Sequence, residues 1–248
     1  MEETRLMMGM PITVKVADRA VTPALFEEVF AYFAYVDRTF STYKAESEIS
    51  RINRRELRLE DASPDVQTIF ELAEQTRQET DGYFDIRHKG EYDPLGLVKG
   101  WAIFNAAQLV RRDGHTDFYV EAGGDIQTAG KNAEGQRWRV GIRNPFNMQE
   151  IVKVLALSNR GIATSGTYIR GQHIYNPKET GDPLNEVVSI TVIGPDVYEA
   201  DRFATAAFAM GRRGIYFIEK LADFEGYMID RTGQATFTSG LGRYLAYD

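Results

Sequence analysis

The spacing of apolar residues changes along the chain from a strand pattern to a helical one. Residues 10–17, MPITVKVA, alternate between apolar and polar positions and predict a strand. Residues 22–43 carry apolar side chains three or four positions apart, at Leu25, Val29, Phe33 and Val36. This spacing predicts an amphipathic helix whose aromatic residues belong to the core rather than to a platform for a ligand.

The same periodicities predict elements along the rest of the chain. Helices are expected at 47–53 (a short polar helix or turn), 63–80, 97–112, 195–211 and 213–222. Strands are expected on both sides of a glycine pair within 117–130, at 138–145, at 187–194, at 226–231 and 234–238, and as a hairpin formed by 151–159 and 161–166. Residues 83–95 show no regular pattern. Because strands follow one another in hairpin-length steps, an α+β class with antiparallel or mixed sheets and packed helices is favoured.

Composition restricts the possible classes of function. The 248 residues carry a net charge of −7, and an acidic chain argues against broad nucleic-acid binding. No run approaches 18 apolar residues, so no membrane span is expected, and cysteine is absent, which excludes thiolate metal sites and cysteine nucleophiles. The first residues lack the features of a secretory signal. We therefore expect a cytoplasmic protein, with a trimmed leader as the alternative, and one domain over residues 1–248, since no linker-like tract interrupts the chain.

The predicted helix 195–211 carries a pair of oxygen ligands. Asp201 and Thr205 are four residues apart, so both side chains project from one helix face, whereas Arg202 points elsewhere and does not neutralise the carboxylate. A carboxylate and a hydroxyl are hard ligands suited to Mg²⁺, which takes few protein ligands and completes its shell with phosphate and water. The alternative is an ordinary polar edge on an amphipathic helix.

Two glycine-containing segments are further candidates for a binding site. In YDPLGLVKGWA, residues 92–102, Asp93 and Lys99 flank a turn in which Gly96 permits close approach of a ligand. Lys99 in the first helical turn, where the helix dipole disfavours a cation, hints at an anionic partner; the alternative is a solvated lysine. The glycine pair in VEAGGDIQTAG matches no phosphate-loop or dinucleotide motif and indicates a bulge or a close backbone approach beside a ligand.

The segment GIATSGTYIRGQHIYNP, residues 161–177, surrounds His173 with hydroxyl side chains. A triad with Ser165 is conceivable, but no GxSxG motif supports it, and a structural histidine is the alternative. The aromatic pair in TDGYFDIR, residues 80–87, either lines a ring-shaped ligand or ends a helix.

Taken in order, the motifs of the chain resemble those of one family. The matching stretches are MMGMPITVKV, STYKAESEISRIN, TDGYFD, DPLGLVKGWA, VEAGGDIQTAG, WRVGIRNP, ATSGTYIRGQHIYNPKETGDP and ITVIGPDVYEADRFATAAF. They are similar to the ApbE family of FAD:protein FMN transferases from about residue 7 to residue 211. The resemblance implies an ApbE-like, T-fold-related α+β architecture that binds FAD and Mg²⁺.

The resemblance also implies a reaction. Members of the family split FAD at its pyrophosphate, attach FMN to a threonine or serine hydroxyl of a target flavoprotein, and release AMP. Some relatives instead hydrolyse FAD to FMN and AMP. A hydrolase and a non-catalytic FAD-binding protein are therefore the alternative functions for this chain, and its oligomeric state is left open.

Site residues follow from the same resemblance. Asp201 and Thr205, with the backbone carbonyls of Gly96 and Ala204, are the expected Mg²⁺ ligands. The expected FAD contacts are Met8, Tyr83, Phe84, Asp85, Asp93, Lys99 and Tyr175, and His173 is the candidate general base. Two departures stand out: only seven residues separate GYFD from DPLG, where relatives carry a long insertion, and Asn176 replaces an aspartate.

Overall fold

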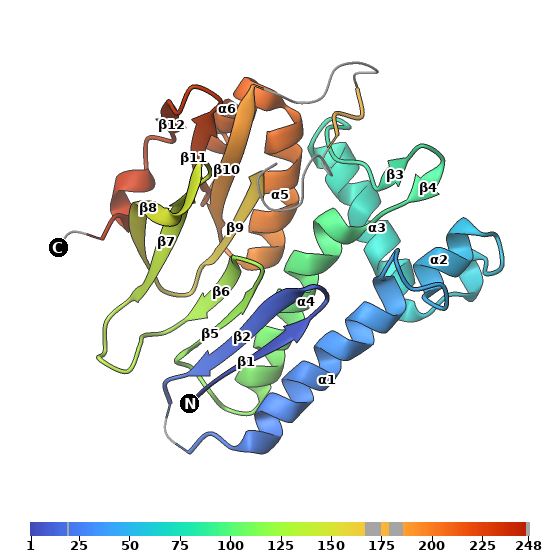
Figure 1. Cartoon of the computed structure of the whole chain (residues 1–248), viewed down its shortest axis with the longest axis horizontal. Helices are drawn as coiled ribbons and strands as arrows, with labels where there is room; N and C mark the ends of the chain where they lie inside the picture. Colours follow the sequence, from blue (N-terminus) through green and yellow to red (C-terminus); the bar gives the residue numbers. More distant parts are fainter. Residues whose placement is uncertain (19, 167–174, 179–185, 247–248) are drawn as a thin grey trace.

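An eight-stranded sheet runs through the centre of the protein, and all of its strand pairs are antiparallel (Figure 1). The structure is a computed structural model that describes residues 1–18, 20–166, 175–178 and 186–246. The strand order is β1-β2-β5-β6-β9-β10-β11-β12. The strands span β1 (Glu2–Met7), β2 (Met10–Val16), β5 (Phe118–Ala122), β6 (Asp125–Ala129), β9 (Gly161–Gly166), β10 (Val187–Gly194), β11 (Glu225–Asp230) and β12 (Ala235–Phe237).

The remaining elements lie on the two faces and at one end of this sheet. The helices span α1 (Pro23–Phe40), α2 (Glu48–Asn53), α3 (Pro64–Glu79), α4 (Leu95–Arg112), α5 (Val197–Ala209) and α6 (Gly214–Glu219). Short 3₁₀ turns cover Leu59–Asp61, Gly211–Arg213 and Leu241–Tyr244. Two separate hairpins complete the fold, β3 (Arg87–His88) with β4 (Glu91–Tyr92), and β7 (Trp138–Asn144) with β8 (Asn147–Leu157). The predicted α+β class is confirmed, and its main sheet is antiparallel rather than mixed.

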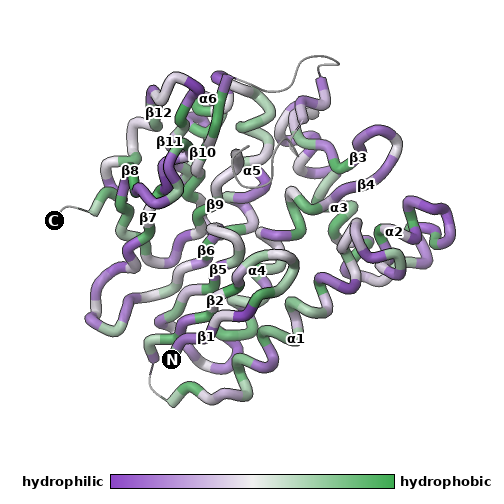
Figure 2. Tube along the Cα trace, viewed as in Figure 1, coloured by the Kyte–Doolittle hydropathy of each residue, from purple (hydrophilic) through white to green (hydrophobic). Residues whose placement is uncertain are grey.

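Helices cover one face of the sheet because the inward residues of both are apolar. Along β2, Ile12, Val14 and Val16 are fully buried against α1 and α4, as their alternation predicts. The second half of the sheet packs its apolar side chains against α5 and α6. Apolar residues recur along α1, α4 and the central strands, whereas polar residues dominate the β3–β4 hairpin (Figure 2).

The other face is covered mainly over the second half of the sheet, and Trp138 of β7 also packs on Tyr119 of β5, with 5.1 Å between the ring centroids. Over that second half, the β7–β8 hairpin buries apolar residues such as Leu155 and Leu157 against β9, β10 and β11. Because both of its faces are covered, β10 is buried at every position but one, which explains why its sequence is rich in β-branched residues. No helix among the described residues combines the length and the apolar composition that crossing a bilayer requires.

The predicted hairpin of 151–159 with 161–166 is wrong. Residues 151–157 belong to β8, which pairs with β7, while β9 lies between β6 and β10 in the main sheet. The chain reverses at residues 145–146 instead, where the Asn144 side chain accepts a hydrogen bond from the backbone N–H of Phe146. The residues between β8 and β9 carry the chain from the covering layer into the sheet.

Other element boundaries also differ from expectation. The edge strand β1 was not predicted, and the segment 83–95 contains the β3–β4 hairpin and the start of α4. Since α4 begins at Leu95 rather than at residue 97, Lys99 lies in the second turn of the helix. The expected clash of Lys99 with the helix dipole is therefore wrong, because that effect is confined to the first turn.

We expect Phe33→Ala to lower the free energy of unfolding by about 3–5 kcal/mol, since a fully buried aromatic side chain is lost. Urea denaturation followed by circular dichroism measures this. Phe146→Ala is the control: its side chain is 57% exposed, and the expected change is below about 0.5 kcal/mol. Equal losses in both variants would contradict the assignment of α1 to the core.

Candidate active site

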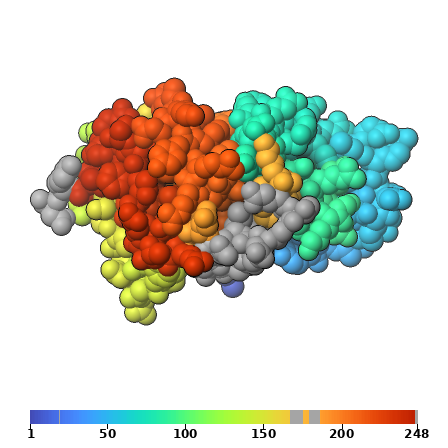
Figure 3. All heavy atoms as spheres, turned by 90° about the horizontal axis from the view of Figure 1, so that it is seen from above, coloured from blue at the N-terminus to red at the C-terminus, as the bar shows by residue number. Residues whose placement is uncertain are grey.

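A cleft of about 500 Å³ opens at the end of the molecule where α4 and α5 meet β9. Its walls come from segments that are far apart in sequence: the loop after α1, residues 83–93, the start of α4, the β5–β6 turn, the end of β9, residues 175–177 and α5. Seen from above, the α3 and α4 half (cyan to green) lies beside the α5 to β12 half (orange to red) in Figure 3. The cleft is thus built at the junction of the two halves of the chain.

Most of the predicted site residues line this one cleft. They are Tyr83, Phe84, Asp85, Asp93, Gly96, Lys99, Tyr175, Asp201 and Thr205. Met8 lies in the turn between β1 and β2 and is not part of the lining, and Ala204 is fully buried within α5. His173 lies outside the described residues. The roles expected for these residues stay predictions, but the geometry brings nine of them together.

Two glycines of α4 pack directly against the two oxygen-bearing residues of α5. A Cβ atom at Gly100 would lie 2.6 Å from the Cβ of Asp201 and 2.9 Å from the carbonyl oxygen of Val197. The Gly100 backbone N–H donates to the Asp201 carboxylate at 2.8 Å. One turn earlier, the Thr205 hydroxyl lies 3.3 Å from the carbonyl oxygen of Gly96. Glycine is required because only a bare backbone lets the helices approach this closely.

Lys99 extends between two buried carboxylates. Its ammonium group lies 2.5 Å from the carboxylate of Asp125 and 3.7 Å from that of Asp201. Asp125 is 1% exposed and its other oxygen accepts the backbone N–H of Thr164 at 2.9 Å. Burial of charge is tolerated when it is paired and hydrogen-bonded, and this trio carries a formal charge of −1. Asp125 was not predicted, although it directly follows the glycine pair that was singled out.

The glycine pair forms the tight turn between β5 and β6. Gly123 and Gly124 have φ angles of +60° and +96°, which residues with a side chain rarely adopt. The pair is therefore a hairpin turn rather than a bulge, and Gly123 contributes backbone to the cleft lining.

The donor set around Asp201 fits a hard divalent cation. The Asp201 carboxylate, the Thr205 hydroxyl and the Gly96 carbonyl oxygen line the same part of the cleft, and the Ser165 hydroxyl lies 3.4 Å from that of Thr205. Within the described ranges, no cluster of three or more histidine or acidic side chains with metal-ligand spacing occurs. Carboxylate, hydroxyl and carbonyl oxygens are donors of the kind that hard cations accept together with phosphate and water.

Aromatic rings form the facing wall. The rings of His88 and Tyr175 lie 3.9 Å apart between centroids, and the Tyr175 hydroxyl donates to the backbone carbonyl of Asp85 at 2.6 Å. Burial, assisted by the carboxylates of Asp85 and Asp93, raises the pKa of the Tyr175 phenol well above its usual value. Tyr175 therefore remains a neutral donor at physiological pH.

Tyr43, His88 and Asn53 are among the cleft residues that were missed in the sequence. Tyr43 follows α1 and is 90% exposed on the rim of the cleft. His88 belongs to the segment that showed no regular pattern. Asn53 ends α2 and holds that segment through its side-chain amide: its Nδ2 donates to the carbonyl of Tyr92 at 2.9 Å, and its Oδ1 accepts the Tyr92 N–H at 2.8 Å. Only their position within the quoted motif STYKAESEISRIN could have pointed to Tyr43 and Asn53.

Fold and cleft together define an α+β protein whose cleft combines aromatic rings, a partly buried lysine and a set of oxygen ligands. A sequence profile of the ApbE family matches residues 8–93 and 87–228. The chain therefore belongs to the ApbE family.

Curated relatives carry one name. The FAD:protein FMN transferase of Salmonella typhimurium is 30% identical across 62% of this chain and 44% of its own length. The protein of that name from Escherichia coli K12 is 31% identical over the same shares, and that from Vibrio cholerae is 34% identical across 50% of this chain and 40% of its own length. The chain thus matches less than half of the length of these relatives.

Solved structures share the whole fold. The flavin transferase ApbE from Vibrio cholerae superposes with a TM-score of 0.85 at 24% identity and covers 99% of both chains. The ApbE protein from Thermotoga maritima has a TM-score of 0.86 at 19% identity, covering all of this chain and 99% of its own. At these identities the likeness establishes the fold.

We expect Gly100→Ala to lower the free energy of unfolding by about 1–3 kcal/mol, because the new methyl group meets the backbone of α5 and the Asp201 side chain. Chemical denaturation measures the loss. Gly242→Ala is the matched control, since its Cβ would enter open space, and it should change stability by less than about 0.5 kcal/mol. A Gly100→Ala protein as stable as wild type would show that α4 and α5 can separate without cost.

Proposed function

We propose that this protein is a Mg²⁺-dependent FAD:protein FMN transferase, which moves FMN from FAD onto a threonine or serine hydroxyl of a target flavoprotein and releases AMP. The observation that carries the proposal is the cleft itself: the Asp201, Thr205 and Gly96 oxygens share one cavity with an aromatic wall and with Lys99. FAD carries ring systems on a pyrophosphate, so it would use the oxygen ligands for a metal, the aromatic rings for stacking and the Lys99 cation for the phosphates. Family membership and the names of the curated relatives support the same function.

Some cleft residues would bind the rings of FAD, and others would stabilise the charge of its phosphates. Tyr83, Phe84 and Tyr175 offer ring faces and apolar surface to a flavin or adenine ring. The chain as a whole is acidic, so a pyrophosphate must be met by a local positive charge. Lys99 supplies that charge in the cleft. Bound Mg²⁺, held by Asp201, Thr205 and the carbonyls of Gly96 and Ala204, would add positive charge at the phosphate oxygens, which is the main requirement of phosphoryl transfer.

The transfer step balances without a further reactant. The acceptor hydroxyl oxygen forms a bond to the phosphorus of the FMN half, and the bond from that phosphorus to the bridging oxygen breaks, so AMP leaves. The hydroxyl proton must pass to a base within about 3 Å, and His173 is the proposed base. Ser165 is not needed as a nucleophile in this scheme, because the attacking hydroxyl belongs to the acceptor protein.

Hydrolysis of FAD to FMN and AMP is the second candidate. Only the short β3–β4 hairpin fills the stretch between the GYFD and DPLG motifs, and Tyr43 and Asp93 on the cleft are exposed to solvent. Water can therefore reach the position that an acceptor hydroxyl would take. A protein that binds FAD without cleaving it is the remaining alternative.

One assay separates the three functions. The protein is incubated with FAD, with and without Mg²⁺, and with and without a recombinant flavoprotein domain that carries a threonine attachment site; AMP is quantified, and the acceptor is checked for in-gel flavin fluorescence. AMP release only with both Mg²⁺ and acceptor supports the transferase. AMP release without acceptor identifies a hydrolase, and bound but intact FAD in every mixture would refute both enzymes.

We expect Asp201→Asn to lower Mg²⁺-dependent AMP release by at least about 100-fold, since metal charge stabilisation is worth several kcal/mol. Asparagine keeps the shape and can still accept the Gly100 N–H, so folding should persist. Asp223→Asn is the control: Asp223 has a 76% exposed side chain outside the cleft lining, and full activity is expected. Wild-type activity in Asp201→Asn would rule out the proposed metal site.

A further inference from the structure

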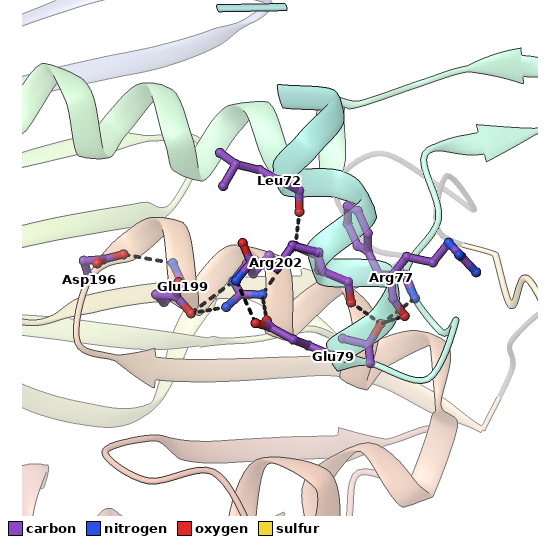
Figure 4. A network of polar contacts seen from close by, with 10 residues as sticks. Leu72, Arg77, Glu79, Asp196, Glu199 and Arg202 are labelled. Atoms are coloured by element: carbon purple, nitrogen blue, oxygen red, sulfur yellow. Dashed lines mark hydrogen bonds and ion pairs between the residues drawn. The ribbon is translucent and has the colours of Figure 1, made fainter. Parts of the chain in front are cut away.

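Arg202 is a buried cation on the helix that carries Asp201 and Thr205. The residue is 5% exposed, and its guanidinium bonds three acceptors (Figure 4). Glu199, one turn earlier on α5, accepts from Nε at 3.0 Å and from Nη2 at 2.6 Å. Nη1 reaches across to α3, where it donates to Glu79 and to the Thr76 hydroxyl. The guanidinium carbon also lies 4.0 Å from the centroid of the Phe203 ring.

The α3 end of this network continues into the cleft wall. Thr76 and Glu79 lie in the last turn of α3. The Thr80 hydroxyl donates to the carbonyl of Thr76 at 2.7 Å and accepts the backbone N–H of Phe84 at 3.1 Å. Arg202 and Thr80 therefore both bond to Thr76, through its hydroxyl and its carbonyl respectively, and Thr80 connects this end of α3 to Phe84 in the cleft lining.

Residues 201 and 205 face the cleft, while residue 202 faces α3, so α5 contacts a neighbour on two sides. On the first side, Asp201 is bonded to Gly100 of α4. On the second, Arg202 is bonded to α3, as Figure 4 shows. α5 also packs on the sheet through apolar side chains, and the polar contacts to α4 and α3 add two directional restraints on its rotation. The rotation of α5 decides where the Asp201 carboxylate points.

We propose that Arg202 is a positioning residue, which holds the cleft-lining residues 83–85 in register with the oxygen ligands of α5. The proposal rests on the proposed function, which gives residues 83–85 the role of FAD contacts and Asp201 and Thr205 the role of metal ligands. Arginine suits this task because its planar guanidinium offers five donors in fixed directions, whereas a lysine ammonium offers three donors on a flexible stem. Partial burial works to raise the pKa of Glu79, but hydrogen bonds from Gln75 and Arg202 hold this pKa below its usual value. The Glu79–Arg202 pair is therefore charged at neutral pH.

Glu79→Gln tests the proposal with little risk to folding. The Glu79 side chain is 38% exposed, so a glutamine there can be solvated, and Arg202 keeps its bonds to Glu199. We expect amide exchange in residues 80–85 to become about tenfold faster, as the loss of a charge-assisted hydrogen bond predicts. Exchange in β10 should stay unchanged, and the melting temperature should fall by no more than about 4 °C.

Glu74→Gln is the matched control. Glu74 is on the same helix and pairs with Arg77 at 2.8 Å, but both of these side chains are about half exposed and lie outside the cleft lining. Wild-type exchange in 80–85 is expected for this variant. Equal acceleration in both variants, or in neither, would overturn the proposal, as would acceleration spread evenly over the whole protein.

Kinetics provide the second readout. Glu79→Gln should raise the KM for FAD, or lower kcat at saturating FAD, by about tenfold, because a small misplacement of ligand-binding groups slows the chemistry. Glu74→Gln should leave both unchanged. If the wild-type protein leaves FAD intact, the proposed function fails, and amide exchange in 80–85 still decides the role of Arg202. An unaltered KM and kcat in an active Glu79→Gln enzyme would reduce Arg202 to a purely structural role.

Discussion

The close contact between α4 and α5 determines the rest of the site. Gly96 and Gly100 leave the α4 backbone bare, so that Asp201 and Thr205 reach it directly. Two helices whose side chains interlock are usually 8–10 Å apart, and glycine removes the side chains that would keep them there. The oxygen ligands are therefore gathered by helix packing rather than by a loop, which gives them rigid support.

Charge in the interior is the second constraint, and the protein meets it by pairing each interior cation with carboxylates. The chain has an excess of acidic residues, yet the partly buried Lys99 of α4 lies between Asp125 and Asp201, and the buried Arg202 of α5 lies between Glu79 and Glu199. An isolated charge in the interior would cost several kcal/mol, so each charge is paired. The first cluster faces the cleft and the second faces α3.

The antiparallel sheet explains why residues so distant in sequence meet in one cleft. Strand β9 is inserted between β6 and β10, which brings the ends of both halves of the sheet to the same edge of the molecule. The β7–β8 hairpin covers the opposite face and so leaves the helical side free for the site. Hydrogen bonds from two side chains of other elements hold the segment 83–93 in place: Asn53 bonds the backbone of Tyr92, and Tyr175 bonds that of Asp85.

The sequence by itself determined the class of the fold, most helices and nine of the residues that line the cleft, because periodicity and ordered motifs are local properties of the chain. It placed Asp201 and Thr205 on one helix face, since a spacing of four does so in any α-helix. It failed for the partner of β8, because strand pairing depends on which apolar faces meet in three dimensions. The same reason hid the pairing of Lys99 with Asp125, the contact of Gly100 with Asp201 and the bonds of Arg202 to α3: each joins residues whose distance in sequence says nothing about their distance in space.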